Sequence, residues 1–317
     1  MMKKLLIVFV SICILLLAAV YIFIPSKLEI SKVEYINCNI NGAFRVLSNE
    51  KTWHKWWPQD SSSNKKYDDS SRSFFYKGYN YHLSQKFYNA IEVAITRDGS
   101  THESKIVIIK LNIDSVVVMW KCVLKTGLNP VTRILKFNEA ENIKNNMSEI
   151  LSGLRIFLDN KENIYGINLH VIMSKDSTMV LTKKISSTYP TTTEIYSLIG
   201  NLKKYIASEK AKENNFPMLH VKKLEDSTFE TMVAIPVNKE LPGNSEISFS
   251  RFVPWKVLTA EVKGGDKTVQ EALRQMKVFI SDYQKTAMAI PFQSLVTDRS
   301  KQPDTTKWIT NIYTPVP

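Results

Sequence analysis

The C-terminal half of the chain repeats its own sequence pattern, and this repeat constrains the fold more than any other feature. Residues 229–237 and residues 308–316 both follow the order aromatic-x-Thr-x-apolar-x-x-Pro-Val. Further upstream, Val180-Leu181-Thr182 matches Val257-Leu258-Thr259. Such self-similarity indicates one supersecondary unit used twice. Two units are too few for a solenoid, so we predict that they pair into one closed domain, whose seam is a natural place for a ligand.

Length, composition and charge restrict the class of protein. A chain of 317 residues with sparse glycine and proline is expected to form two domains without a long flexible linker. The net charge of +12 is compatible with binding to nucleic acid or to an anionic membrane surface. Lysine, however, is scattered among acidic residues and forms no basic run. We therefore favour a solvated basic surface and expect no nucleic-acid partner.

The N-terminus predicts a membrane anchor. Residues 5–24 contain no charged side chain and have the length of a helix that crosses a bilayer core. Lys3-Lys4 precede them and are expected to stay in the cytoplasm. We interpret residues 1–26 as a single-pass, uncleaved anchor in a bacterial inner membrane, with the following domains on the periplasmic side. The alternative is a cleaved signal peptide, but the small pair Ala18-Ala19 lies inside the apolar run.

Few side chains suggest metal, cofactor or redox chemistry. The five histidines have no metal-ligand spacing, and the chain has no Walker loop, Gly-x-Gly-x-x-Gly motif or Gly-x-Ser-x-Gly elbow. We expect no metal and no cofactor. Cys38 and Cys122 lie in strand-like sequence. They allow one disulfide bond in an oxidising compartment, although we favour two buried thiols.

Residues 28–160 have the element order of one soluble domain. Residues 28–37 alternate apolar and polar side chains, with one phase slip near Ser31-Lys32, as expected of a strand. A short helix follows Asn39, and a polar loop is expected at residues 61–66. Apolar residues at helical spacing between residues 143 and 158 predict a long final helix. The intervening strands are expected at residues 73–77, 79–87, 90–96, 105–111 and 115–124.

This stretch resembles the SRPBCC or START-like superfamily. The resemblance rests on the element order, on the segment from Trp53 to Pro58 and on the segment from Asn129 to Arg133. It implies a helix-grip fold with a cavity between a curved sheet and the long helix, often holding an apolar ligand. The alternative is that aromatic side chains fill this space as a core. The rings concerned are Trp56, Trp57, Tyr79, Tyr81, Phe87 and Trp120.

Residues 165–317 predict a second domain, built from repeats at residues 165–237 and 245–317. Each repeat has the order strand, helix, strand, strand, and its first strand region is divided in two. Thr191 and Glu194 predict a capped start of the first helix, and Gly264-Gly265 precede the second. Together with the first domain, this gives an α+β chain. The strands are expected at residues 167–173, 178–185, 219–221, 230–237, 247–252, 256–262, 292–297 and 308–314.

The second domain resembles the GyrI-like family, which also forms the effector-binding domains of AraC- and MerR-type regulators. The motifs that carry the resemblance are residues 252–255, 261–265, 303–308 and 312–316. It implies two βαββ units around a central cleft that binds small, flat, often cationic molecules. In such a cleft an acidic residue meets the cation and aromatic rings stack on it.

The chain departs from the family at Asn311, where the family commonly has glutamate. A neutral amide cannot neutralise a buried cation or activate water, so cation binding and hydrolysis both become doubtful. Glu230 and Glu261 are candidates for a substitute acid, but we predict that Glu230 faces away from Asn311. Asn311 and Tyr313 lie two apart on one strand and are expected to share the cleft face. The alternative is that both only pack a core or the seam between the halves. The other predicted cleft residues are Trp308, Trp255 and Phe292, although Trp308 and Tyr313 cannot both face the cleft without a bulge.

Three functions remain in competition. The leading one is a membrane-anchored, non-catalytic protein that binds a small aromatic or amphipathic molecule. The second is a hydrolase or cyclase-like enzyme that uses one of the two cavities, which requires a buried carboxylate or histidine. The third is an interaction module for an unidentified envelope protein, which predicts an exposed apolar patch instead of a deep pocket.

Overall fold

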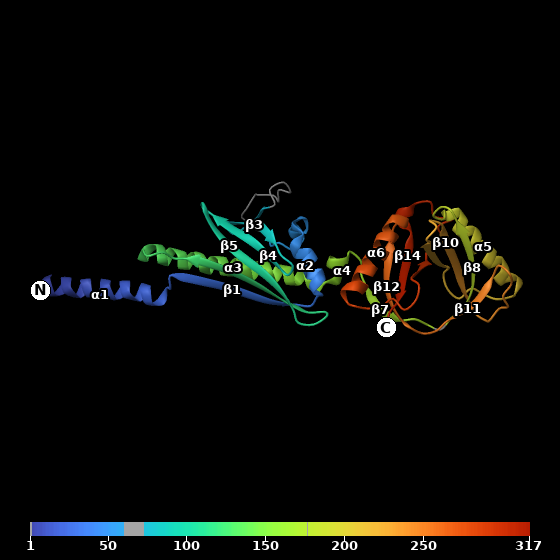
Figure 1. The fold of residues 1–317 in the computed structure, drawn as a ribbon, viewed down its shortest axis with the longest axis horizontal. Coiled ribbons are helices and arrows are strands. Elements are labelled where there is room, and N and C mark those ends of the chain that lie inside the picture. The colour runs from blue at the N-terminus through green and yellow to red at the C-terminus, as the bar shows by residue number, and fades with distance from the viewer. Residues whose placement is uncertain (1, 60–72, 176) are drawn as a thin grey trace. The chain divides into compact units, whose positions relative to one another are not determined.

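The protein is an α+β chain that divides into two compact units, Met1–Asn160 and Lys161–Pro317 (Figure 1). The computed structural model describes residues 2–59, 73–175 and 177–317, so the loop expected at residues 61–66 lies outside the described residues. The second unit begins four residues before the expected domain start, with the short helix α4 (Lys161–Tyr165). Tyr165 explains this, because its buried hydroxyl donates a 2.8 Å hydrogen bond to Asp282 Oδ2.

The predicted N-terminal helix is present as α1 (Met2–Phe23). Its segment Lys4–Phe23 is long and apolar enough to cross a membrane, judged by length and composition, and none of it is buried in the protein. A helix of this length spans about 30 Å at about 1.5 Å per residue.

The first unit contains one antiparallel sheet. β1 and β6 pair without interruption from Lys27↔Lys125 to Ile36↔Val116, so the predicted phase slip in β1 is wrong. Val33 and Tyr35 instead lie on the exposed face, where single apolar residues are tolerated. In sheet order, the strands are β1 (Lys27–Ile36), β6 (Val116–Lys125), β5 (Ser100–Lys110), β4 (Ala90–Arg97), β3 (Tyr79–Lys86) and β2 (Ser73–Tyr76).

The last helix of the first unit is longer than its apolar pattern predicts. α3 spans Pro130–Asp159 and packs against β1 and β6, after the shorter α2 (Ile40–Ser48) and the 3₁₀ helix η1 (Glu50–Lys55) earlier in the chain. Asn129 caps α3 by accepting hydrogen bonds from the amides of Val131 and Thr132, and proline occupies its first turn. An Asn-Pro pair is a known start signal, but the apolar stripe buried against the sheet begins only near residue 140.

The fold keeps the two cysteines of the first unit apart. Cys122 pairs with Ile30 in β1, whereas Cys38 lies beyond Ile36, the end of that strand. Six strand residues separate these points by roughly 20 Å, far more than the reach of a disulfide bond. Both side chains are buried thiols, and burial raises the pKa of each to about 12.

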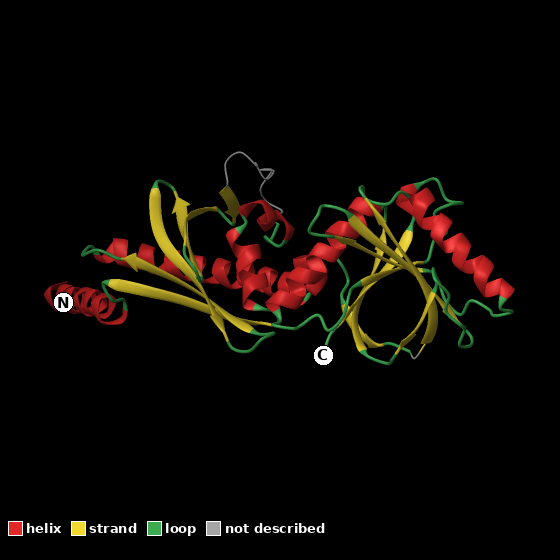
Figure 2. Cartoon of the chain, turned by 45° about the vertical axis from the view of Figure 1, so that its right-hand side comes forward, coloured by secondary structure: helices red, strands yellow, loops and turns green. Residues whose placement is uncertain are grey.

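The second unit contains one eight-stranded antiparallel sheet that curls around, with two helices on its outer face (Figure 2). The helices are α5 (Thr192–Ser208) and α6 (Asp266–Asp282). A short 3₁₀ helix, η2 (Thr305–Lys307), precedes the last strand. In sheet order, the strands are β11 (Ser248–Phe252), β8 (Ser177–Ser186), β10 (Phe229–Val237), β9 (Met218–Lys223), β13 (Phe292–Leu295), β14 (Ile309–Pro315), β12 (Lys256–Lys263) and β7 (His170–Met173).

The sequence repeat corresponds to a structural repeat. β8-α5-β9-β10 and β12-α6-β13-β14 have the same order, and the two halves meet where β9 pairs with β13. The strand that precedes each half pairs with the other half: β7 adds to β12, and β11 adds to β8. This exchange ties the two halves into one sheet. It depends on long-range pairing that the strand pattern alone does not encode.

Alternate residues of each strand point to opposite faces of the sheet. One set packs against the helices, and the other lies on the inner face. Val233 and Ile235 of β10 face α5 and join its apolar core, and Ile312 of β14 does the same for α6. Their neighbours Pro236 and Tyr313 therefore lie on the inner face. The Thr191–Glu194 capping box predicted at the start of α5 is confirmed.

Candidate ligand-binding site

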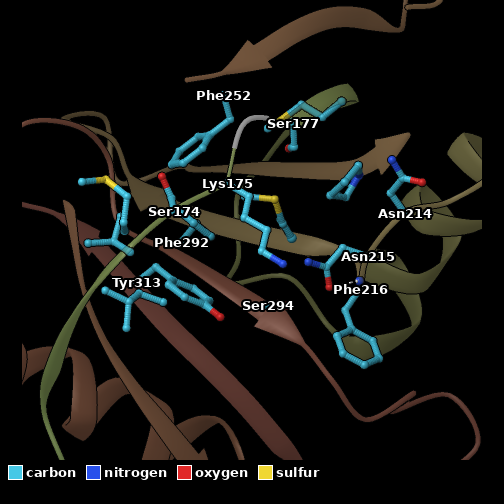
Figure 3. A pocket seen from close by; sticks show the side chains of 16 residues that line it. Ser174, Lys175, Ser177, Asn214, Asn215, Phe216, Phe252, Phe292, Ser294 and Tyr313 are labelled. Carbon is cyan, nitrogen blue, oxygen red and sulfur yellow. Dashed lines mark hydrogen bonds between the residues drawn. The ribbon is translucent and has the colours of Figure 1, made fainter. Parts of the chain in front are cut away.

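A cavity of about 500 Å³ lies on the inner face of the curved sheet in the second unit (Figure 3). This volume falls in the range of pockets that hold small molecules. Its aromatic and proline lining consists of Phe216, Pro236, Phe252, Phe292 and Tyr313, and its aliphatic lining of Ile172, Met173, Met179, Met218 and Val257. Its polar lining consists of Ser174, Lys175, Ser177, Asn214, Asn215 and Ser294.

The lining is built by cross-strand pairs. Residues that pair directly across an antiparallel sheet point to the same face, so each pair contributes two neighbouring side chains to the cavity. The strands involved come from both halves of the repeat. The pairs are Ile172↔Val257, Ser177↔Phe252, Met179↔Pro236, Met218↔Ser294 and Phe292↔Tyr313.

Three rings from three strands form one wall of the cavity. Phe292 and Tyr313 stack with centroids 4.9 Å apart and an interplanar angle of 18°. Phe252 meets Phe292 edge to face at 5.7 Å and 79°. Aromatic pairs in these geometries are favourable and present flat, polarisable surfaces to a ligand. All three rings are only partly buried, so a bound molecule can reach them.

The other side of the cavity is formed by the loop between β7 and β8 and by the segment before β9. Ser174 in this loop is held by Trp255: their backbones share a 2.8 Å hydrogen bond, and the Trp255 amide donates to Ser174 Oγ at 2.8 Å. Asn214 donates through Nδ2 to the Val237 carbonyl at 3.0 Å. The two contacts with Trp255 hold the backbone of Ser174, which directly precedes Lys175.

Two of the five predicted cleft residues, Tyr313 and Phe292, line this cavity, and three do not. Asn311 shares the inner face with Tyr313, as predicted, and lies opposite Ser294, but beyond the edge of the cavity. Trp255 is partly exposed and positions Ser174, while its indole Nε1 donates to the Val316 carbonyl.

Trp308 is buried outside the cavity, beside an arginine. Its indole Nε1 donates to the Gln302 carbonyl at 2.8 Å, and the Arg299 guanidinium lies 4.7 Å from its ring centroid. Arg299 also donates to Asp266 Oδ1 and to Thr310 Oγ1, both at 2.8 Å. This buried arginine joins the start of α6 to β14 and has no counterpart in the sequence prediction.

The predicted orientation of Glu230 is wrong. β10 keeps its register from Phe229 to Val237, so Glu230 lies on the same face as Pro236, which lines the cavity. Asn311 is on this inner face as well. The repeat itself indicates this face, because Glu230 aligns with Ile309, and Ile309 lies two residues from Asn311 on the same strand and thus on the same face. Glu230 is half-buried, and its carboxylate lies 3.7 Å from Lys183 Nζ.

Lys175, Asn215 and Phe216 were missed by sequence reasoning because they lie in loops. Lys175 lies in the break between the strands predicted at residues 167–173 and 178–185, and its neighbour Asp176 lies outside the described residues. No periodic pattern marks a loop residue as a lining residue. In the described part of the chain, no three His, Cys, Asp or Glu side chains come together as a metal site.

The predicted rings of the first unit pack mainly on one another. Trp56, Trp57, Tyr81 and Trp120 are all buried, and burial raises the pKa of Tyr81. Tyr81 meets Trp57 at 5.2 Å and Trp120 at 5.9 Å, both edge to face. Tyr79 is also buried, whereas Phe87 is partly exposed beneath Lys105 Nζ. These contacts correspond to the alternative in which the aromatic side chains fill a core.

Comparisons with known proteins give only distant likenesses. No protein-family model and no curated protein sequence matches the chain. Among solved structures, the EcmrR C-terminal domain is 14% identical over 48% of this chain and 98% of its own, with a TM-score of 0.40. SAV2435 bound to tetraphenylphosphonium is 17% identical over 48% of this chain and 94% of its own, with a TM-score of 0.33. A hydrolase from Listeria innocua is 9% identical over 47% and 92%, with a TM-score of 0.37. At this level, the likenesses are too weak to transfer a ligand or an activity.

Proposed function

We propose that this chain is a membrane-anchored binding protein for small, partly aromatic or amphipathic molecules, and that the cavity of the second unit is the binding site. The observation that carries the proposal is the wall of three partly exposed rings, Phe252, Phe292 and Tyr313, in a cavity of about 500 Å³. Pockets of this size with apolar walls and few polar groups typically bury most of a small ligand.

We propose that the chain binds its ligand without catalysing a reaction. General acid–base chemistry usually relies on a histidine or a carboxylate within hydrogen-bond reach of the reacting group. Among the described lining residues there is neither, and the polar groups are hydroxyls, amides and one ammonium. A hydrolase or cyclase-like activity would have to recruit an acid or base from outside this lining.

The N-terminal helix supports the membrane-anchored part of the proposal. α1 offers 20 residues of high hydropathy, none of which is buried in the protein, and Lys3 and Lys4 precede most of this segment. Positive residues favour the cytoplasmic side, which would place both folded units on the periplasmic face of a bacterial inner membrane.

The test is ligand binding by the full chain in lipid nanodiscs, with empty nanodiscs as the blank. Equilibrium dialysis against small naphthalene derivatives measures the dissociation constant. We expect Tyr313→Ala to weaken binding about fivefold, since a ring contact is worth about 1 kcal/mol. Tyr189→Ala is the control, because this ring lies outside the lining. Equal affinities for both variants, or no binding to wild type, would contradict the proposal.

A further inference from the structure

The polar side of the cavity consists of positively charged or hydrogen-bond-donating groups. Lys175 is the only charged side chain among the sixteen described lining residues. Its side chain extends into the cavity toward Asn215 (Figure 3). Asn215 Oδ1 accepts a hydrogen bond from the Phe216 amide at 2.8 Å, so its NH₂ group is the end that faces Lys175. An ammonium and an amide NH₂ therefore converge on one place.

Two acidic residues of the described chain lie near this place in sequence or register, and neither is placed to neutralise Lys175. Glu213 precedes Asn214, but its carboxylate lies 3.1 Å from Lys203 Nζ. Glu261 is exposed on β12, four residues beyond the lining residue Val257, which corresponds to about 13 Å along the strand. Within the described residues, the field at the polar side of the cavity is thus set by Lys175.

We propose that the ligand is an organic anion: a carboxylate, sulfonate or phosphate attached to a flat apolar body. This inference rests on the proposed binding function and specifies its ligand class. The body lies against Phe252, Phe292 and Tyr313, while the anionic group accepts hydrogen bonds from Lys175 Nζ and Asn215 Nδ2. Hydrogen bonds between charged partners are shorter and stronger than neutral ones. A cation in the same place would meet the like charge of Lys175.

Three probes with one aromatic body and different charge test the inference. 2-Naphthoate is anionic, 2-naphthalenemethanol is neutral and 2-naphthylmethylammonium is cationic. With the full chain in neutral-lipid nanodiscs at low salt, we expect naphthoate to bind about threefold to fivefold more tightly than the alcohol, which is the upper part of the range for an ion pair at an exposed site. The ammonium probe should bind most weakly, and added salt should reduce both differences.

The matched variants are Lys175→Met and Lys204→Met. Lys175→Met should abolish the preference for naphthoate and leave the affinity for the alcohol unchanged, whereas Lys204 lies on α5 outside the cavity and its replacement should change nothing. Equal binding of all three probes to wild type, or tighter binding of the ammonium, would overturn the anion inference while leaving the binding function intact. Binding of none of the probes would remove the proposed function itself.

A second surface, at the start of α3, carries an independent inference. Leu128, Val131 and Leu135 are 84%, 63% and 62% exposed. Val131 and Leu135 lie four residues apart on one side of the first turns of α3, and Leu128 lies just before the helix. This apolar surface lies beside the end of α1: the Tyr21 hydroxyl donates to the Leu128 carbonyl, and the buried Arg133 guanidinium lies 4.5 Å from the Tyr21 ring centroid.

We propose that this surface inserts into the outer boundary of the lipid bilayer. Tyr21 lies at the end of the apolar segment Lys4–Phe23, and tyrosine prefers the membrane–water interface. Since α3 begins beside Tyr21, its exposed apolar residues are level with that interface when α1 spans the bilayer. Burial in lipid then removes their apolar area from water, as for a partly inserted amphipathic helix. This inference rests on the proposed membrane anchor.

Spin labels on the full chain in liposomes test the insertion. Labels at Leu135→Cys and at Ile156→Cys, which is also exposed but lies about 32 Å further along α3, are compared with a label on the native Cys13 in α1. Relaxation by oxygen reports lipid, and relaxation by a water-soluble nickel chelate reports water. We expect lipid exposure at residues 13 and 135 and water exposure at residue 156. A lipid-exposed residue 13 with a water-exposed residue 135 would overturn only the insertion, whereas water exposure at residue 13 would overturn the anchor.

Discussion

Aromatic side chains serve different purposes in the two units. In the first unit, Trp57, Tyr81 and Trp120 are buried against one another, and the Trp120 indole donates to the buried Ser104 hydroxyl at 2.8 Å. In the second unit, Phe292 and Tyr313 stack just as closely but remain partly exposed to a cavity. Ring contacts therefore do not distinguish a core from a binding wall. What distinguishes them is whether another element covers the free face of the ring.

Replacement of one ring in each unit should give the largest contrast in stability. Trp120→Ala removes a fully buried side chain, and we expect it to lower the unfolding free energy of the first unit by about 3 to 5 kcal/mol. Tyr313→Ala should cost about 1 kcal/mol or less in the second unit, because its ring already faces open space. Hydrogen exchange measured by mass spectrometry on the full chain reports each unit separately. Similar losses for the two variants would show that Tyr313 is a core residue after all.

Replacement of Arg299 tests whether contacts on the helix side of the second unit contribute to stability as much as the buried core of the first unit. Arg299→Ala removes two 2.8 Å hydrogen bonds and the contact with Trp308, and we expect a loss of about 2 to 4 kcal/mol in that unit. Arg274→Ala, which breaks an exposed ion pair with Glu271 on α6, should have no measurable effect. If the two variants behave alike in hydrogen exchange, then Arg299 does not join the start of α6 to β14.

Two glycines inside helices sharpen the comparison further. A Cβ at Gly153 in α3 would lie 2.6 Å from the Trp56 carbonyl oxygen, so Gly153→Ala forces backbone apart and should destabilise the first unit by about 1 to 3 kcal/mol. At Gly200 in α5 nothing lies within 4 Å, and Gly200→Ala should stabilise the second unit by up to about 1 kcal/mol. Chemical denaturation followed by far-UV circular dichroism can measure both shifts. A stabilising Gly153→Ala would refute the close contact between α3 and Trp56, which directly follows η1.

The sequence predicted the parts of the fold that depend on local periodicity. The order of the repeated elements, the apolar α1 and the capped start of α5 all follow from patterns within about twenty residues. The exchange of β7 and β11 between the halves does not, because it depends on pairing between distant segments. The start of α3 was missed for another reason: its first turns carry exposed apolar residues that do not match a buried stripe.

The site was only partly predictable for similar reasons. Tyr313 and Phe292 could be found because strand alternation and the repeat place them on the inner face. Lys175 and Asn215 are positioned by loop conformation, which a single sequence does not specify. The burial of Trp56 and Trp120 could not be separated from cavity lining, because hydrophobic periodicity indicates which way a ring points and not what lies in front of it.

The reactivity of the two buried thiols directly reports whether solvent reaches the interior of the first unit, and the effect expected on stability is the smallest of those considered. Burial raises the pKa of Cys38 and of Cys122 from the ordinary 9.0 to about 12, so at pH 8 both thiols stay almost entirely protonated. Alkylation of the folded chain should therefore be very slow at both positions and become fast in denaturant, which peptide mass spectrometry can follow for each cysteine.

The same shift predicts the pH dependence of stability. Between pH 9 and pH 12 the unfolded thiols lose protons that the folded thiols keep, so the two cysteines stabilise the fold fully below pH 9 and less as the pH rises toward 12. A Cys38→Ala, Cys122→Ala double variant should show a shallower loss over that range, with lysine and tyrosine titration common to both proteins. Rapid labelling of either thiol at pH 8 would mean that the first unit opens readily, and its rings would then resemble those of the cavity more than those of a closed core.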